Sequence, residues 1–215
     1  VGLNWTPAPG QFIYVFAARG YDSGGLATGG PAFGPEHVND FELGWKSTLL
    51  DGRLQTQIGV FDELYTGKQE EIFNVEGGSA GQQVANLIGG TKIRGVEASA
   101  VGRFGGFGFS LGGSFTHSAL GALNTVAAYK LPTNANGLAQ CTGGATPPSC
   151  FYYDPYYVDL SGEQNSYSPK FTFNASIDYN IPVGNNSLQP RLTYSYTGRQ
   201  YASIFEQDDY YLMGS

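Results

Sequence analysis

The 215-residue chain lacks an apolar run long enough to cross a bilayer as a helix, which needs about 18 residues or more. Its mean hydropathy is only -0.21. A membrane protein of that polarity must cross with strands, because only helices and closed barrels satisfy the backbone in lipid. The chain has one Met but 32 Gly, 15 Tyr and 14 Phe. This composition is unlike an ordinary helical domain.

Positive charge is also scarce, with 11 Lys and Arg against 18 Asp and Glu, for a net charge of -7. Nucleic-acid binding depends on clustered Lys and Arg, so we expect no nucleic-acid partner. The only histidines are His37 and His117, which cannot form a His-based metal triad. Asp154, Asp159 and Glu163 could offer oxygens to calcium, but their spacing matches no known binding loop. Solvated acids are the favoured interpretation, and we predict no metal and no cofactor.

Sequence motifs of catalysis are few. Residues 77–81 read GGSAG and match G-x-S-x-G, but the nucleophile elbow needs a strand before the serine and a helix after it. This copy lies in a glycine-rich loop. The chain has no phosphate loop and no dinucleotide fingerprint after a strand. We therefore predict no catalytic residues and no enzyme activity.

Two cysteines, Cys141 and Cys150, lie in one Gly- and Pro-rich stretch. Such a pair predicts a local disulfide in an oxidising compartment, with two free thiols as the alternative. The chain does not open on a signal peptide, which every bacterial outer-membrane protein needs. We expect the sequence to be a mature form or a fragment.

Apolar and polar residues alternate in residues 107–116, 171–181 and 188–197. Side chains on a strand point alternately to its two faces, so each run has one apolar and one polar wall. The same alternation occurs in a soluble sandwich, whose apolar wall turns inward.

Loop lengths favour a membrane barrel over a sandwich. Short connections at residues 7–10, 51–52, 103–106 and 182–187 alternate with long ones at about 20–37, 67–90, 118–167 and 199 onward. Connections in compact soluble domains are mostly about 4 to 6 residues, whereas outer-membrane barrels combine short periplasmic turns with long outer loops. We therefore predict an all-β, antiparallel transmembrane β-barrel segment with almost no helix outside the loops.

Eight strands are predicted when each turn is taken as a change of direction. Asp51-Gly52 is the strongest hairpin signal, since a type I′ turn needs positive φ at both central residues. The first strand is too short to cross a membrane, so the chain begins inside a strand. The predicted strands span about residues 1–6, 11–19, 38–50, 53–66, 91–102, 107–117, 169–181 and 188–198.

The alternation also predicts which side chains face lipid. In the fourth strand the assignment is less regular, because Phe61 and Tyr65 share a face with Gln55 and Gln57. In the last two strands the predicted lipid-facing residues are Phe171, Phe173, Ile177, Tyr179, Leu192 and Tyr194. Those predicted to face the enclosed side are Asn174, Asp178, Arg191 and Thr193.

Three segments carry a resemblance to a known family. Residues 33–47 read FGPEHVNDFELGWKS and residues 90–98 read GTKIRGVEA, while residues 19–25 read RGYDSGG. In order and spacing these resemble barrel motifs of TonB-dependent outer-membrane receptors, in which Pro-Glu leads into a strand ending Glu-Leu-Gly-x-Lys and a later strand carries Gly-Val-Glu. The resemblance covers essentially the whole chain. The matching residues, which mark the barrel wall in that family, are Pro35, Glu36, Glu42, Leu43, Gly44, Lys46, Gly95, Val96 and Glu97.

The resemblance implies a 22-stranded barrel in the outer membrane, plugged by an N-terminal domain that binds the TonB complex. Such receptors import a small nutrient, such as an iron-siderophore, cobalamin or a carbohydrate. The sequence departs from the family in having no plug, no TonB-contacting segment and no terminal strand ending in an aromatic residue. We expect residues 1–215 to be part of one barrel domain, from the later-middle part of the wall.

Two functions from different classes follow. The first is part of the wall and outer loops of an active importer, with outer-membrane lipid, the TonB complex and a small nutrient ligand as partners. The alternative is a small closed eight-stranded barrel with an adhesion or structural role; a soluble ligand-binding β-domain is a third possibility. Aromatics of the longest loop could stack on a ligand or pack on one another, and the ligand-contact candidates are Tyr152, Tyr153, Tyr156 and Tyr157.

Overall fold

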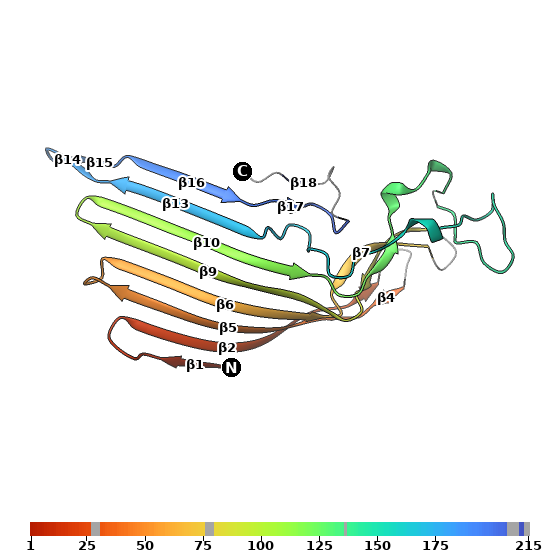
Figure 1. The fold of residues 1–215 in the computed structure, drawn as a ribbon, viewed down its shortest axis with the longest axis horizontal. Helices are drawn as coiled ribbons and strands as arrows, with labels where there is room; N and C mark the ends of the chain where they lie inside the picture. The colour runs from red at the N-terminus through yellow and green to blue at the C-terminus, as the bar shows by residue number, and fades with distance from the viewer. Residues whose placement is uncertain (27–30, 76–79, 136, 206–210, 213–215) are drawn as a thin grey trace.

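The computed structural model describes residues 1–26, 31–75, 80–135, 137–205 and 211–212. Its main feature is one eight-stranded sheet whose strand order follows the chain (Figure 1). Every neighbouring pair is antiparallel. The strands are β1 (Gly2–Trp5), β2 (Gln11–Asp22), β5 (Glu36–Leu49), β6 (Leu54–Thr66), β9 (Gly90–Phe104), β10 (Phe107–Ala119), β13 (Phe171–Tyr179) and β16 (Arg191–Thr197). The predicted fold class is confirmed.

Short turns lie at one end of the sheet and long loops at the other (Figure 1). Residues 6–10, 50–53, 105–106 and 180–190 join strands at the short end. At the Asp51-Gly52 turn the amide of Arg53 donates to the carbonyl of Leu50 at 3.1 Å, and φ is 54° at Asp51 and 84° at Gly52. Positive φ at both central residues is the geometry of a type I′ turn, as predicted.

The hairpin between β13 and β16 follows the prediction, with one local interruption. The strands were expected to continue to residue 181 and restart at 188. The main ladder ends at the Asp178–Arg191 pair, and pairing resumes beyond it between Ile181 and Leu188. β14 (Ile181–Val183) and β15 (Asn186–Leu188) then continue the hairpin in the same register to its tip. Pro190 interrupts the ladder because it has no N–H to donate to Tyr179, although its own carbonyl still accepts from the Tyr179 amide at 3.1 Å.

The long loops contain the remaining elements. They connect β2 to β5, β6 to β9 and β10 to β13, and the last follows β16. No helix in the described part of the chain is long and apolar enough to span a bilayer. The loop elements are β3 (Gly25–Leu26), β4 (Ala32–Phe33), β7 (Gln69–Asn74), β8 (Gly81–Asn86), β11 (Asn124–Val126), β12 (Tyr157–Asp159), β17 (Gln200–Tyr201), β18 (Tyr211–Leu212) and the 3₁₀ turns η1 (Ala128–Lys130), η2 (Thr133–Ala135) and η3 (Asp154–Tyr156).

Every buried apolar side chain of the described residues lies in the long loops and none lies in the eight-stranded sheet. The first loop cluster comprises Leu87, Leu120, Leu123, Leu160 and Ile204. The second loop cluster comprises Val75, Val126, Ala135 and Tyr153. A soluble sandwich would bury the apolar face of its sheet, so this distribution excludes that alternative for the described chain.

The apolar face of the sheet is instead uncovered. Cross-strand partners share a face, so the register links Leu192 to Ile177 and Tyr194 to Ala175 on one side, and Arg191 to Asp178 on the other. Leu192 is 67% exposed and Ile177 is 44% exposed. The predicted division into apolar and polar faces is confirmed, including Phe61 and Tyr65 on the polar face with Gln55 and Gln57.

Candidate functional site

The polar face of the sheet carries most of its charge. Cross-strand partners place Glu42 of β5 beside Phe16 and Phe61, and Asp40 beside Ala18 and Glu63. Acids dominate the part nearer the long loops, whereas basic residues lie near the short turns. The charged residues on this face are Asp22, Glu36, Asp40, Glu42, Lys46, Glu63, Glu97, Arg103, Asp178 and Arg191.

Tyr14 lies flat across this face and joins two strands. Its hydroxyl donates to Glu42 Oε1, and its ring covers Gly44, where a Cβ would lie only 2.3 Å from the ring. The neighbouring Gly59 is the partner of both Gly44 and Glu97. Glycines at these positions therefore leave room for a large hydrogen-bonded side chain between two carboxylates on the polar wall.

An ion cluster lies on the same face near the short turns. Arg103 donates to Asp178 Oδ2 at 3.0 Å, Gln189 donates to the same oxygen at 2.7 Å, and Arg191 approaches Oδ1 at 3.7 Å. The Asp178 side chain is 7% exposed. Arg53 lines the same depression of about 310 Å³. The cluster ties β9, β13 and β16 together and leaves surplus positive charge at this end.

The four tyrosines of the longest loop occupy different environments. Tyr153 is completely buried in the second loop cluster, and its hydroxyl faces the carbonyls of Ala135 at 2.8 Å and Leu138 at 2.7 Å. Burial raises the pKa of Tyr153 above its ordinary value. Tyr156 is half-buried beside Phe151, with ring centroids 5.8 Å apart.

The other two tyrosines, Tyr152 and Tyr157, are exposed. They lie on the same loop as Tyr153 and Tyr156, so all four candidates belong to one structural unit. Only the exposed pair presents aromatic surface outside the loop cluster. The four tyrosines are close together in the sequence, but the tertiary packing covers two of them and leaves the other two exposed.

The long loops are joined to one another by polar side chains. Asn86, at the end of β8, accepts from the Gly34 amide at 2.6 Å and donates to the Gly34 and Gly67 carbonyls. Gln69 donates to the carbonyls of Ser23 and Gly34. Asn86 and Gln69 carried no sequence signal, because their partners are loop backbone atoms distant along the chain.

The longest loop is also closed on itself. Cys141 and Cys150 form a disulfide with sulfurs 1.99 Å apart. Asp159 accepts from the amide and the hydroxyl of Ser161 at 2.9 and 2.5 Å. These hydrogen bonds lower the pKa of Asp159 below its ordinary value.

The G-x-S-x-G match is not followed by the helix that a nucleophile elbow needs. Residues 77–79 of the G-x-S-x-G match lie outside the described residues, and the segment connects two strands, β7 and β8, rather than a strand to a helix. Across the described ranges, no group of three or more His, Cys, Asp or Glu side chains is placed to hold a metal ion.

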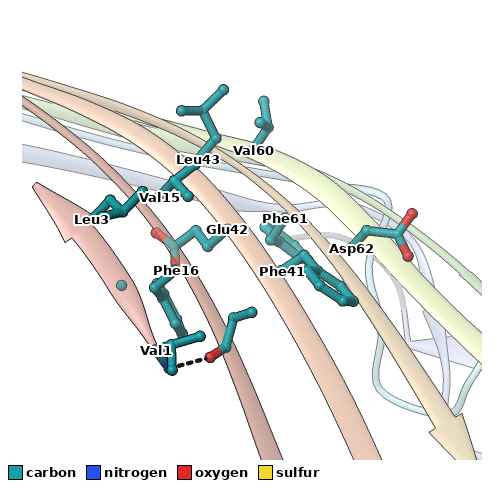
Figure 2. A pocket seen from close by; sticks show the side chains of 12 residues that line it. Val1, Leu3, Val15, Phe16, Phe41, Glu42, Leu43, Val60, Phe61 and Asp62 are labelled. Carbon is teal, nitrogen blue, oxygen red and sulfur yellow. Dashed lines mark hydrogen bonds between the residues drawn. The ribbon is translucent and has the colours of Figure 1, made fainter.

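An apolar hollow of about 650 Å³ opens over β1, β2, β5 and β6 (Figure 2). Its lining includes Leu3, Val15, Leu43 and Val60, which the register places on the uncovered apolar face. Figure 2 shows Leu43 and Val60 side by side on neighbouring strands. Asp62 lies at the border of this hollow.

Comparison with known proteins agrees with this architecture. The family model described as TonB-dependent receptor-like, β-barrel matches residues 1–214. No curated protein sequence matches the chain.

Solved structures with similar folds include the ferric yersiniabactin uptake receptor FyuA from Yersinia pestis, at a TM-score of 0.68 and 18% identity. The siderophore receptor PiuA from Acinetobacter baumannii is similar at 0.64 and 18%. Each match covers 100% of this chain but 27% of the solved chain. The chain thus spans about a quarter of the length of these receptors. From its family match over nearly every residue, its open antiparallel wall and its uncovered apolar face, the chain belongs to the TonB-dependent receptor-like β-barrel family of the outer membrane.

Proposed function

We propose that this chain forms part of the wall and outer loops of a receptor that imports an iron-siderophore across the outer membrane. The supporting observation is the match along the entire chain to receptors for iron chelates, including the ferric-catecholate import receptor Fiu from E. coli K12. These likenesses, at 15–18% identity, concern the fold. That the ligand is an iron-siderophore is our inference.

The proposed route for the ligand runs along the polar face of the sheet. That face carries hydrogen-bonding and charged side chains, among them Tyr14, Glu42 and Arg103. A water-filled lumen suits such residues, whereas lipid suits the uncovered opposite face. We infer that residues 1–215 belong to one barrel domain and that a plug elsewhere in the polypeptide couples it to TonB.

Tyr152 and Tyr157 are the proposed ligand contacts. Their aromatic rings are exposed, while Tyr153 is enclosed and Tyr156 packs on Phe151. Aromatic side chains combine a large apolar surface with a polar hydroxyl, which suits an organic chelate that has both ring and oxygen groups. The buried second loop cluster would hold the exposed pair in place.

The small closed barrel is not favoured as an alternative. The described sheet begins at β1 and ends at β16, and these two strands do not pair with each other. A closed barrel requires that pairing because unpaired edge groups cost several kcal/mol each in lipid. Additional wall strands satisfy the edges in the proposed receptor.

Uptake by cells that carry or lack the full-length protein tests the proposal. Under iron limitation, growth is expected to depend on the protein with one class of ferric chelate among catecholate, hydroxamate and phenolate types. Protein-dependent uptake of cobalamin or an oligosaccharide, with no dependence for any ferric chelate, would contradict the ligand class.

The two proposed ligand contacts are tested separately, by measuring binding of the ferric chelate to the purified full-length protein. Tyr152→Ala and Tyr157→Ala are each expected to weaken chelate binding by about 3- to 10-fold, as for the loss of one aromatic contact. Tyr21→Ala is the matched control, because Tyr21 is 76% exposed but lies on the outward face of β2. Wild-type affinity in both loop variants would exclude these tyrosines while leaving the importer itself supported.

A further inference from the structure

Charge on the outward, lipid-facing side of the sheet is confined to one end. Alternation and register place Arg19, Asp62, Lys92 and Arg94 on this side, all toward the long loops. The eight described strands carry no other charged residue on this face. Three of the four are cations, although the chain as a whole has a net charge of -7.

The level of these residues matches the outer border of the membrane. Phe104 and Phe107 pair beside the short turn, and Arg94 and His117 pair higher in the same two strands. The separation from Phe104 to Arg94 is about 33 Å along the strand. At a strand tilt of about 40°, this is roughly 25 Å along the membrane normal, which is the usual height of the apolar band. Arg94 therefore lies where lipid headgroups begin.

Lys92 and Arg94 form a compact cationic pair. They are two positions apart on one face of β9, so their Cα atoms are about 6.6 Å apart. Arg94 lies opposite His117 on β10 and opposite Asp62 on β6. The Arg94–Asp62 ion pair is long, at 3.8 Å, and both side chains are about half exposed. Asp62 thus offsets one cation and leaves the pair with surplus positive charge.

Apolar surface lies immediately below the cations. Asp62 borders the apolar hollow, and Val60 and Leu43 continue it toward the membrane centre (Figure 2). Val96 follows Arg94 on the same face of β9 and is 39% exposed. A lipid could therefore place its phosphorylated headgroup on the cations and its acyl chains on the apolar surface below them.

We propose that Lys92 and Arg94 form a binding site for the phosphate of an outer-leaflet lipid whose acyl chains lie on the apolar rows below. Arg supplies a planar fork that suits phosphate and Lys a compact point charge. Arg19 lies three strands away in the same register row and adds a further cation to this face. The proposal rests on the barrel's orientation and does not depend on which ligand is imported.

Binding of lipid A to the purified full-length protein tests this site, with native mass spectrometry as the readout. Diphosphoryl lipid A should bind wild-type protein, whereas the same lipid without phosphates should bind at least tenfold more weakly. Equal binding of the two lipids would overturn the proposal without the need for any variant. Displacement of lipid A by millimolar inorganic phosphate would also overturn it, since that result indicates a free-anion site.

Variants provide a second test, in which lipid A binding is expected to weaken in one variant and to tighten in another. Lys92→Gln with Arg94→Gln should weaken binding of diphosphoryl lipid A by about 25-fold, at about fivefold per cation near a membrane surface. Asp62→Asn should tighten it, because the competing carboxylate is removed. Lys130→Gln, which alters an exposed cation in the outer loop, should leave it unchanged. Wild-type affinity in the double variant would refute the site.

Discussion

Arg103 on β9 reaches Asp178 on β13 by passing over the intervening strand, with a hydrogen bond of 3.0 Å. The residue beneath this contact is Gly108 of β10, the register partner of both. A Cβ at position 108 would lie 2.8 Å from Arg103 Nη2 and 2.8 Å from Asp178 Oδ1. The glycine therefore leaves the space in which the ion pair spans three strands.

We expect Gly108→Leu to break this contact and to lower the thermal stability of the full-length barrel. The new side chain would separate Arg103 from Asp178, leaving a nearly buried carboxylate short of a donor. Thr116→Leu, farther along the same face of β10, adds bulk away from the ion pair and serves as the control. Equal melting temperatures for the two variants, measured by heat-modifiable gel mobility, would show that the ion pair contributes nothing.

Orientation is tested by placing one cation on each face. Phe173 pairs with Tyr196 on the lipid-facing side, whereas Thr193 pairs with Ser176 on the lumen side. Phe173→Arg should reduce the yield of assembled protein, because a cation on the lipid face near mid-membrane costs about 2 to 4 kcal/mol. Thr193→Arg should assemble normally and alter only the charge of the lumen. Similar outer-membrane yields of the two variants would argue against this orientation.

The buried tyrosine hydroxyl should stabilise the longest loop. Tyr153→Phe keeps the ring but leaves the carbonyls of Ala135 and Leu138 without this donor. We expect a local loss of about 1 to 3 kcal/mol, seen as faster amide hydrogen exchange in residues 137–153. Tyr152→Phe changes an exposed hydroxyl and should leave exchange unchanged. Unaltered protection in Tyr153→Phe would mean that the hydrophobic packing alone holds the cluster.

Acid should loosen the contact between Asp159 and Ser161. The pKa of Asp159 is lowered in the fold, mainly by the Ser161 hydroxyl and then by its amide. A lowered folded pKa means that the stabilisation is complete above the ordinary pKa of an aspartate and is lost as the pH falls through the lower, folded value. Ser161→Ala should raise the pKa of Asp159, as followed by carboxyl-carbon NMR of labelled protein.

Ser149→Ala provides the control for that titration. The Ser149 hydroxyl donates to the Thr146 carbonyl at 2.8 Å in the same loop, without a carboxylate partner. Its loss should leave the Asp159 pKa where it is in the wild type. A lowered pKa of Asp159 that survives in Ser161→Ala would assign the effect to the backbone amide alone.

Local sequence features were sufficient to predict the barrel wall. A period of two determines which side chains share a face, and Asp51-Gly52 determines a turn with positive φ because Gly and Asp tolerate it. Loop lengths then distinguished a membrane wall from a soluble sheet. The predicted turn after β13 is also present, and Pro190 interrupts the pairing only locally because it cannot donate to a ladder.

The contacts between loops and across strands were decided only by the tertiary structure. Asn86 meets Gly34, 52 residues away in the chain, and Arg103 meets Asp178 across Gly108 of the strand between them. The sequence pattern cannot tell which of Tyr152 and Tyr153 is exposed, because they are adjacent residues of the same type. By itself the sequence determined the strands, their faces and the family, since these depend on nearest neighbours and periodicity. Burial, ion pairing and the cationic border depend on which strands come together, so they emerged only from the fold.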